Sequence, residues 1–154
     1  MKIFKMLSLA AALLFAVACG EKENNPNGPS SAGGWDNLEQ EWKLVSVDGV
    51  KNDFTVYIKF ESGLFALYQQ VYSWDYVFYE GEYSVDGAVL SGTYFDGGEW
   101  KTPYTGGVSA DGKTLTLKSK ETTPVTYTYE ACTIPENIKD EATATRAMEV
   151  VPFL

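Results

Sequence analysis

Residues 54–71 read FTVYIKFESGLFALYQQV, and the fold class follows from this stretch. Its first half alternates in steps of two, as a strand with one buried face does: Val56, Ile58 and Phe60 fall on one side, and Thr55, Tyr57 and Lys59 on the other. The Ser62–Gly63 pair then leads into a second run, 64–71. Two strand-like runs joined by two turn residues predict a β-hairpin.

The same pattern continues on both sides of this hairpin, with no helical period between the runs. Asp–Gly pairs at 86–87 and 111–112 mark further tight turns, because Gly accepts the positive φ that such turns demand. The remaining runs are 42–48, 74–83, 88–95, 100–108, 113–118 and 125–132. Eight strands with hairpin-length connections predict an all-β, antiparallel up-and-down barrel, whose closure removes both sheet edges. A two-sheet sandwich fits less well, since no long crossover connection is evident.

The end of the chain has a different composition. Residues 134–142 predict a short helix, with Pro135 in its first turn and acidic residues early. Residues 143–154 are unassigned, and for 148–154 an added strand and a loose end both remain open.

The first nineteen residues carry an export signal. Lys2 and Lys5 precede an apolar run, 6–17, that is too short to span a bilayer as a resident helix. The tetrad that ends in Cys19 resembles the bacterial lipobox, so residues 1–18 are predicted to be a lipoprotein signal peptide and Cys19 the acylated residue. An ordinary cleaved signal and a short membrane anchor are the alternatives.

Residues 19–34 are rich in Gly, Pro, Asn and Ser. They are predicted to form a lipid-anchored flexible tether, because such a stretch cannot bury enough apolar area to offset its ordering entropy. Glu21, Lys22 and Glu23 resemble the acidic export tags of surface lipoproteins in Bacteroidetes, and a charged soluble tether is the alternative reading. The predicted location is the cell envelope, on the outer membrane, with the surface face and the periplasmic face both left open and the membrane as partner through acylated Cys19.

The composition bounds the domain and restricts its partners. Removal of residues 1–18 takes away Lys2 and Lys5, which leaves ten basic residues against 21 acidic ones and a formal charge of −11. Nucleic acid is not an expected partner, since phosphate backbones are bound by basic patches. Residues 35–154 have the length of one domain, about 120 residues.

Catalytic signals are few, and no enzyme activity is predicted. The chain has no histidine, and Cys132 is the only thiol besides Cys19, so neither a histidine-based triad nor a zinc site is expected. No cofactor or metal is predicted. Glu80, Glu82 and Asp75 come nearest to a pair of catalytic carboxylates, but acids on the outward face of a strand ordinarily serve solubility.

Aromatic residues gather in the middle of the chain and supply the candidate binding residues. If they line the barrel, a cavity for a small ligand is expected around Tyr57, Tyr68, Tyr83, Trp100 and Tyr104. In the run 74–83, Trp74, Tyr76 and Phe78 share one face and Tyr79 the other, so one of the two sets points outward as a surface patch. The plainer reading is that all these residues are core and cross-strand pairs of the barrel.

Several motifs together resemble the lipocalin-like lipoproteins of gut Bacteroidetes. They are Trp42-Lys43-Leu44-Val45-Ser46, Tyr57-Ile58-Lys59-Phe60, Gly81-Glu82-Tyr83, Leu90-Ser91-Gly92-Thr93-Tyr94, residues 111–117 and Ile134-Pro135-Glu136-Asn137. The resemblance covers residues 41 to about 140 and implies a calycin-type barrel without an established activity. The sequence departs from true lipocalins at Gln40, where they carry Gly, and in the distance of its sole arginine, Arg146, from the last strand.

The sequence therefore predicts an envelope lipoprotein with a lipocalin-like barrel that binds a small apolar or semi-polar ligand. The alternative is a surface module without a cavity. Such a module would recognise glycan or a partner protein through exposed aromatics, here Trp74, Tyr76 and Tyr79.

Overall fold

The structure is a computed structural model, and it describes residues 34–71, 73–144 and 151–154. The predicted signal peptide 1–18, the acylated Cys19 and the tether up to residue 33 lie outside the described residues, as does Arg146.

Within the described residues the chain forms ten strands and one helix. In chain order they are β1 Glu41–Val47, β2 Val50–Lys51, β3 Thr55–Glu61, β4 Leu64–Gln70, β5 Val77–Asp86, β6 Val89–Tyr94, β7 Tyr104–Val108, β8 Thr114–Ser119, β9 Thr126–Cys132, α1 Glu136–Glu141 and β10 Thr143–Ala144. No helix in this part of the chain is long and apolar enough to cross a membrane.

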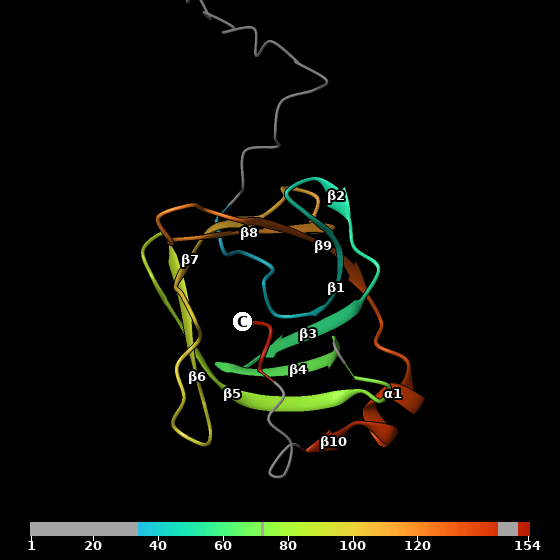
Figure 1. Cartoon of the computed structure of the whole chain (residues 1–154). Helices are drawn as coiled ribbons and strands as arrows, with labels where there is room; N and C mark the ends of the chain where they lie inside the picture. Colours follow the sequence, from blue (N-terminus) through green and yellow to red (C-terminus); the bar gives the residue numbers. More distant parts are fainter. Residues whose placement is uncertain (1–33, 72, 145–150) are drawn as a thin grey trace, which may run out of the picture.

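Eight of the strands close into a ring (Figure 1). Neighbouring strands follow the order β5–β4–β3–β1–β9–β8–β7–β6, all antiparallel, and β6 pairs back onto β5 from Asp86↔Val89 to Gly81↔Tyr94. β2 is a short addition to β1, and β10 a short parallel addition to β5. The predicted eight-stranded antiparallel up-and-down barrel is confirmed.

Residues 54–71 contain the predicted hairpin, formed by β3 and β4. The two strands pair from Thr55↔Gln70 to Glu61↔Leu64. Ser62 and Gly63 both have positive φ, 53° and 79°, which is typical of the type I′ turns that match the twist of two-residue hairpins. The turn fixes the register, and the register places the apolar face of each strand inside the barrel.

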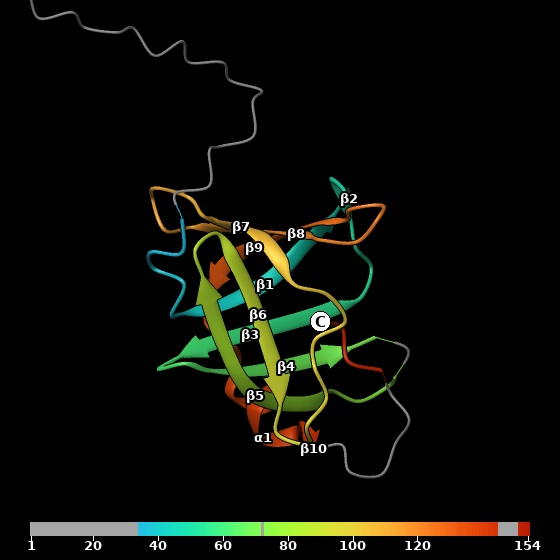
Figure 2. The ribbon, with the colours of Figure 1, turned by 90° about the vertical axis from the view of Figure 1, so that its left-hand side faces the viewer.

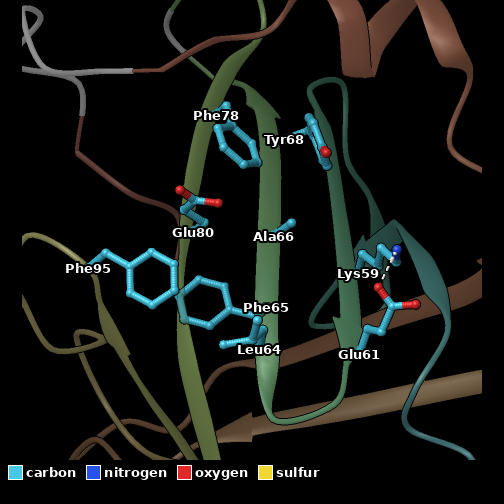
Figure 3. Close-up of a pocket in the computed structure, with 9 residues that line it drawn as sticks. All are labelled: Lys59, Glu61, Leu64, Phe65, Ala66, Tyr68, Phe78, Glu80 and Phe95. Atoms are coloured by element: carbon cyan, nitrogen blue, oxygen red, sulfur yellow. Dashed lines mark ion pairs between the residues drawn. The ribbon is translucent and has the colours of Figure 1, made fainter.

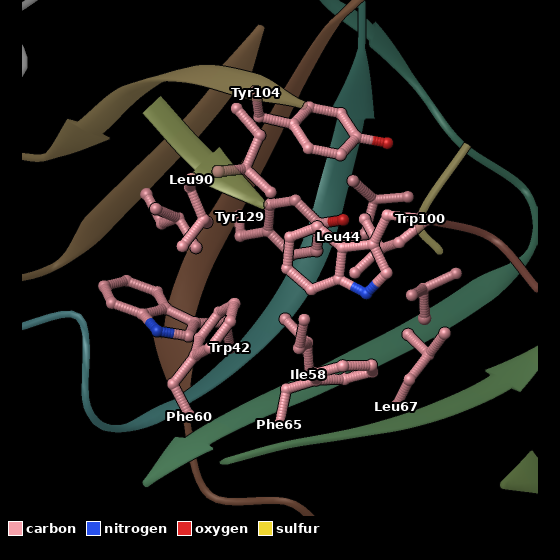
Figure 4. Packing of buried hydrophobic residues seen from close by; sticks show 14 of the residues in the cluster. Trp42, Leu44, Ile58, Phe60, Phe65, Leu67, Leu90, Trp100, Tyr104 and Tyr129 are labelled. Atoms are coloured by element: carbon pink, nitrogen blue, oxygen red, sulfur yellow. The ribbon is translucent and has the colours of Figure 1, made fainter. Parts of the chain in front are cut away.

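The two ends of the barrel are covered by different segments. Residues 35–40 cover one end, where the Leu38 carbonyl accepts a hydrogen bond from Trp42 Nε1 at 2.9 Å. Segment 151–154 lies at the opposite end (Figure 2). Between the two ends the interior is filled by large side chains (Figure 4), among them Trp42, Leu44, Ile58, Phe60, Phe65, Leu67, Leu90, Tyr104, Leu115, Leu117 and Tyr129.

Three strand boundaries differ from the prediction by three residues or more. β5 begins at Val77 rather than at Trp74 and ends at Asp86 rather than at Tyr83, and β7 begins at Tyr104 rather than at Trp100. The Trp100 indole nevertheless reaches the core from the connection before β7. Gly92 on β6 leaves room for it, because a Cβ at Gly92 would lie only 2.4 Å from Trp100 Cε2.

The predicted short helix is present as α1 and lies outside the ring, on β3 and β4. Ile138 packs there in one cluster with Tyr57. Glu41 of β1 anchors this part of the chain: one carboxylate oxygen pairs with Lys139 Nζ at 3.0 Å, and the other accepts a hydrogen bond from Ile134 N at 2.6 Å. The outer face of β3 and β4 is therefore partly covered by protein.

Candidate functional site

The candidate site is the end of the barrel opposite residues 35–40, where segment 151–154 enters the ring (Figures 1 and 2). Four side chains hydrogen-bond to the segment or pack a ring against it there: those of Phe54, Gln69, Tyr94 and Tyr127. They come from the residue before β3 and from β4, β6 and β9. We call these four residues the mouth.

Gln69 holds the main chain of the segment at two points. Its Nε2 donates to Val151 O at 3.1 Å, and its Oε1 accepts from Phe153 N at 2.7 Å. The residue is only 1% exposed, and a buried carboxamide is costly unless its polar groups are paired. Segment 151–154 supplies partners for both groups, much as a neighbouring strand would.

The apolar side chains of the segment fill the space around these bonds. The Phe153 ring packs against Phe54 and Tyr127, at centroid distances of 5.6 and 5.3 Å. Leu154 belongs to the hydrophobic core, and its main-chain oxygen accepts a hydrogen bond from Tyr94 Oη at 3.0 Å. Burial raises the pKa of Tyr94, so its hydroxyl keeps its proton and remains a donor.

Trp100, Tyr104 and Tyr129 are buried in the interior of the barrel (Figure 4), and we call these three residues the floor. The Tyr104 ring is 5.9 Å from Trp100 and 6.0 Å from Tyr127. Burial raises the pKa of Tyr104 and of Tyr129, so both are neutral. Trp100 Nε1 and Tyr129 Oη are buried and have no hydrogen-bond partner among the described residues, and Trp100 Nε1 lies on the side of the indole that packs against Gly92 of β6.

Three of the five predicted ligand-binding residues lie on the inside of the barrel. Trp100 and Tyr104 are in the floor, close to the mouth. Tyr83 also packs against the core, but toward the other end, where its hydroxyl donates to Glu39 Oε1 at 3.1 Å. The structure therefore brings together two of the five residues beside the mouth.

Tyr57 and Tyr68 lie on the outside of the barrel, so predicting them as part of an interior cavity was wrong. Val56 and Ile58 take the inward positions of β3, and the alternation of the strand turns Tyr57 outward. Tyr68 is paired with Tyr57 across β3 and β4 and shares its face. Both side chains join the cluster formed with α1 instead.

For the surface patch the predicted alternatives were Trp74 with Tyr76, or Tyr79, and the structure turns Tyr76 outward and Tyr79 inward. Trp74 is 96% exposed, but Tyr76 is half-buried in the cluster with α1, where its ring centroid lies 6.4 Å from that of Tyr57. Tyr79 turns toward the core, where its ring lies 5.8 Å from Tyr94. The prediction extended strand alternation back to residue 74, although the strand begins only at residue 77.

A hollow of about 260 Å³ lies on the outer face of β3, β4 and β5 (Figure 3). We call it the outer hollow; it is lined by Lys59, Glu61, Leu64, Phe65, Ala66, Tyr68, Phe78, Glu80 and Phe95. It forms because the small Ala66 stands in register between Lys59 and Glu80. Leu64 and Phe95 expose 46% and 57% of their surface at its rim.

The acidic residues of interest are exposed. Glu80 and Glu82 point outward from β5, and Asp75 lies in the connection before it. Among the described residues, no group of three or more acidic or cysteine side chains is placed to hold a metal ion. Cys132 is half-buried, and burial raises the pKa of its thiol, which lowers its reactivity as a nucleophile.

The sequence-based prediction missed the mouth and its occupant, although one signal was present. The inward positions of residues 64–71 are Phe65, Leu67, Gln69 and Val71, so Gln69 is a polar residue in a core position. Such a residue needs a buried partner. Nothing local identifies that partner, because Val151 is 82 residues away.

No protein-family model and no curated protein matches the chain. Among solved structures, one match is described as a lipocalin-like protein from Bacteroides uniformis, with 18% sequence identity and a TM-score of 0.48, covering 62% of this chain and 99% of that chain. Another is described as an uncharacterized protein from Bacteroides eggerthii, with 17% identity and a TM-score of 0.47, covering 61% of this chain and 98% of that chain. Neither description names a ligand.

Proposed function

We propose that this chain is a binding barrel that takes a small apolar or semi-polar ligand at the mouth. One observation carries the proposal. The mouth is occupied by segment 151–154, which belongs to none of the barrel strands and is held by two buried polar side chains, Gln69 and Tyr94. A surface that accepts an apolar segment with polar main-chain groups is suited to a ligand with the same mixture.

The chemistry of the mouth supports this class of ligand. Phe54 and Tyr127 offer aromatic faces, while the Gln69 carboxamide and the Tyr94 hydroxyl offer donors and an acceptor. A few well-placed polar groups in apolar surroundings are typical of small-molecule sites.

The fluorescent apolar probe 1-anilinonaphthalene-8-sulfonate tests the location of this site. Because one aromatic contact contributes about 0.5–1.5 kcal/mol beyond its buried area, Tyr127→Ala should weaken probe binding up to about tenfold when it is made in a chain that also carries Phe153→Asp and Leu154→Asp, in which segment 151–154 no longer competes for the mouth. Leu64→Ala, at the rim of the outer hollow, is the matched control and should leave probe binding unchanged. Probe binding that survives Tyr127→Ala but is lost in Leu64→Ala would exclude the mouth.

The alternative function, recognition of a glycan or a partner protein at the surface, now depends on the outer hollow. Tyr68 and Phe78 pack there at 5.0 Å, beside Glu80 and the exposed Phe95. Aromatic faces next to carboxylates suit sugar rings. A glycan-array signal that disappears in Phe95→Ala supports this alternative, and a signal that persists in Phe95→Ala rules out the hollow as its source.

We also propose that the chain is an envelope lipoprotein, acylated on Cys19 and carried on a flexible tether. The support comes from the sequence alone: an apolar signal, a lipobox-like tetrad and a Gly- and Pro-rich segment behind it. Cys19→Ala should release the protein from the membrane fraction of its host, while Cys132→Ala should not. An unmodified thiol at position 19 in the mature protein would contradict the proposal.

A further inference from the structure

We infer that the mouth is a peptide-binding site and that segment 151–154 is its displaceable internal occupant. The inference rests on the proposed function and names its ligand class: an extended peptide in which an aromatic residue is followed by an aliphatic one. The occupant in the structure, Val151-Pro152-Phe153-Leu154, has this pattern.

Recognition of the main chain is the first reason. Gln69 binds the carbonyl of Val151 and the N–H of Phe153, two residues farther along the chain. In an extended peptide these two groups lie on the same edge, so one carboxamide can bind both. A ligand without a main chain, such as a fatty acid, would leave half of this buried carboxamide unpaired, which disfavours its binding.

The side chains of the segment give the second reason. The Phe153 ring meets Tyr127 edge-on, with an interplanar angle of 78°, and meets Phe54 at a tilt of 52°. Leu154 is 2% exposed, whereas Val151 is 79% exposed. Selectivity should therefore reside in the aromatic and aliphatic positions, while the residue at position 151 contributes its carbonyl.

The loose attachment of the segment is the third reason. Among the described residues, its hydrogen bonds to the barrel come from the side chains of Gln69 and Tyr94. β3 and β4, in contrast, are joined by a main-chain ladder of seven residue pairs. Elements with few bonds open at free energies well below that of global unfolding. An open mouth can then accept a second peptide of the same chemistry.

The test uses the full chain with Phe153→Asp and Leu154→Asp together. Carboxylates are not stable in the apolar mouth, so the segment should leave it while the four residues of the mouth remain. We expect this variant to bind the acetylated tetrapeptide of residues 151–154 about 10–100-fold more tightly than the unaltered chain, in which only the open fraction is available. Isothermal titration calorimetry measures both affinities. The same peptide with alanine in the phenylalanine position is the control and should bind about tenfold more weakly or worse.

The outcomes separate this inference from the proposed function. If the variant binds 1-anilinonaphthalene-8-sulfonate but not the peptide, the peptide inference is wrong and the proposed function stands. If it binds neither, while its near-ultraviolet circular dichroism stays native, both are wrong. If the variant does not fold, hydrogen exchange on the unaltered chain decides. Excess peptide must then accelerate exchange at the Phe153 N–H, and an unchanged rate overturns the inference.

Discussion

Gln69→Met tests whether the buried carboxamide holds segment 151–154 in the mouth. Methionine has nearly the same length but cannot form the bonds to Val151 O and Phe153 N, at 3.1 and 2.7 Å. A hydrogen bond between neutral groups contributes about 0.5–1.5 kcal/mol. Loss of both bonds should therefore lower the free energy for release of segment 151–154 from the mouth by roughly 1–3 kcal/mol. The population with an open mouth should then rise about 5–150-fold. The barrel itself should change less, because a thioether is tolerated in an apolar core.

Hydrogen exchange at the Phe153 N–H measures this opening directly. Its exchange rate should increase by the same factor as the open population, while the amide of Leu67, in the middle of β4, should keep its rate. Gln70→Met is the matched control, since Gln70 is the next residue along the strand and its side chain bonds instead to Trp74 O at 2.6 Å. An unchanged rate at Phe153, or an equal increase in Gln70→Met, would refute the role given to Gln69.

Three further predictions concern the barrel that carries the mouth. Gly92→Ala should lower the free energy of unfolding, measured in urea, by about 1–3 kcal/mol, because the added Cβ would collide with the Trp100 indole. Gly98→Ala is the control and should be nearly neutral, because a Cβ there meets no atom closer than 3.3 Å. Equal effects of the two substitutions would contradict the packing of Trp100 on Gly92. Glu41→Gln should cost about 1–3 kcal/mol through loss of the charged bonds to Lys139 and Ile134 N, and an unaltered urea midpoint would contradict this anchor. Ionisation of the buried tyrosines should not reduce the free energy of unfolding below about pH 10. Above about pH 10 the free energy of unfolding should fall by up to about 1.4 kcal/mol per pH unit for each buried tyrosine, because its pKa is raised in the folded protein and the unfolded chain therefore loses the proton first. The tyrosines are Tyr94, Tyr104 and Tyr129, and ionisation of all three in the folded protein near pH 10, seen as tyrosinate absorbance, would contradict this.

The barrel was predictable because its signals are local. A hairpin such as β3–β4 is specified by alternation and by Ser62–Gly63, and neither depends on the rest of the chain. Six further runs of the same kind leave few topologies open. Ring closure then follows from the need to pair the last edges.

The side of the barrel on which an aromatic residue lies was less predictable. Alternation shows that Tyr57 and Ile58 face opposite ways, but it does not say that α1 covers the side of Tyr57. An outward aromatic row under a helix has the same sequence pattern as an inward row around a ligand. Trp100 shows the converse case, since it enters the core from outside any strand and fills space left by Gly92.

The mouth could not be predicted because it is built from residues that are far apart in the sequence. Gln69 and Val151 are 82 residues apart, and Tyr94 and Leu154 are 60 apart. No short-range period connects them. The one clue, a polar residue at an inward position of β4, shows that a buried partner exists but not where the partner lies in the chain.

The part of the barrel interior that segment 151–154 fills also limits the size of any ligand. An eight-stranded barrel has room for a filled core or for one small ligand, and most of this interior is filled by side chains from the strands and by the indole of Trp100. Phe153 and Leu154, in contrast, belong to a segment that takes part in none of the barrel's strand pairs, so the segment can leave without breaking one. A ligand must therefore replace about one aromatic ring and one aliphatic side chain, and must place a polar group against Gln69 or Tyr94. A longer apolar molecule would have to displace core residues such as Tyr104, and the cost of disrupting a packed core opposes such a ligand.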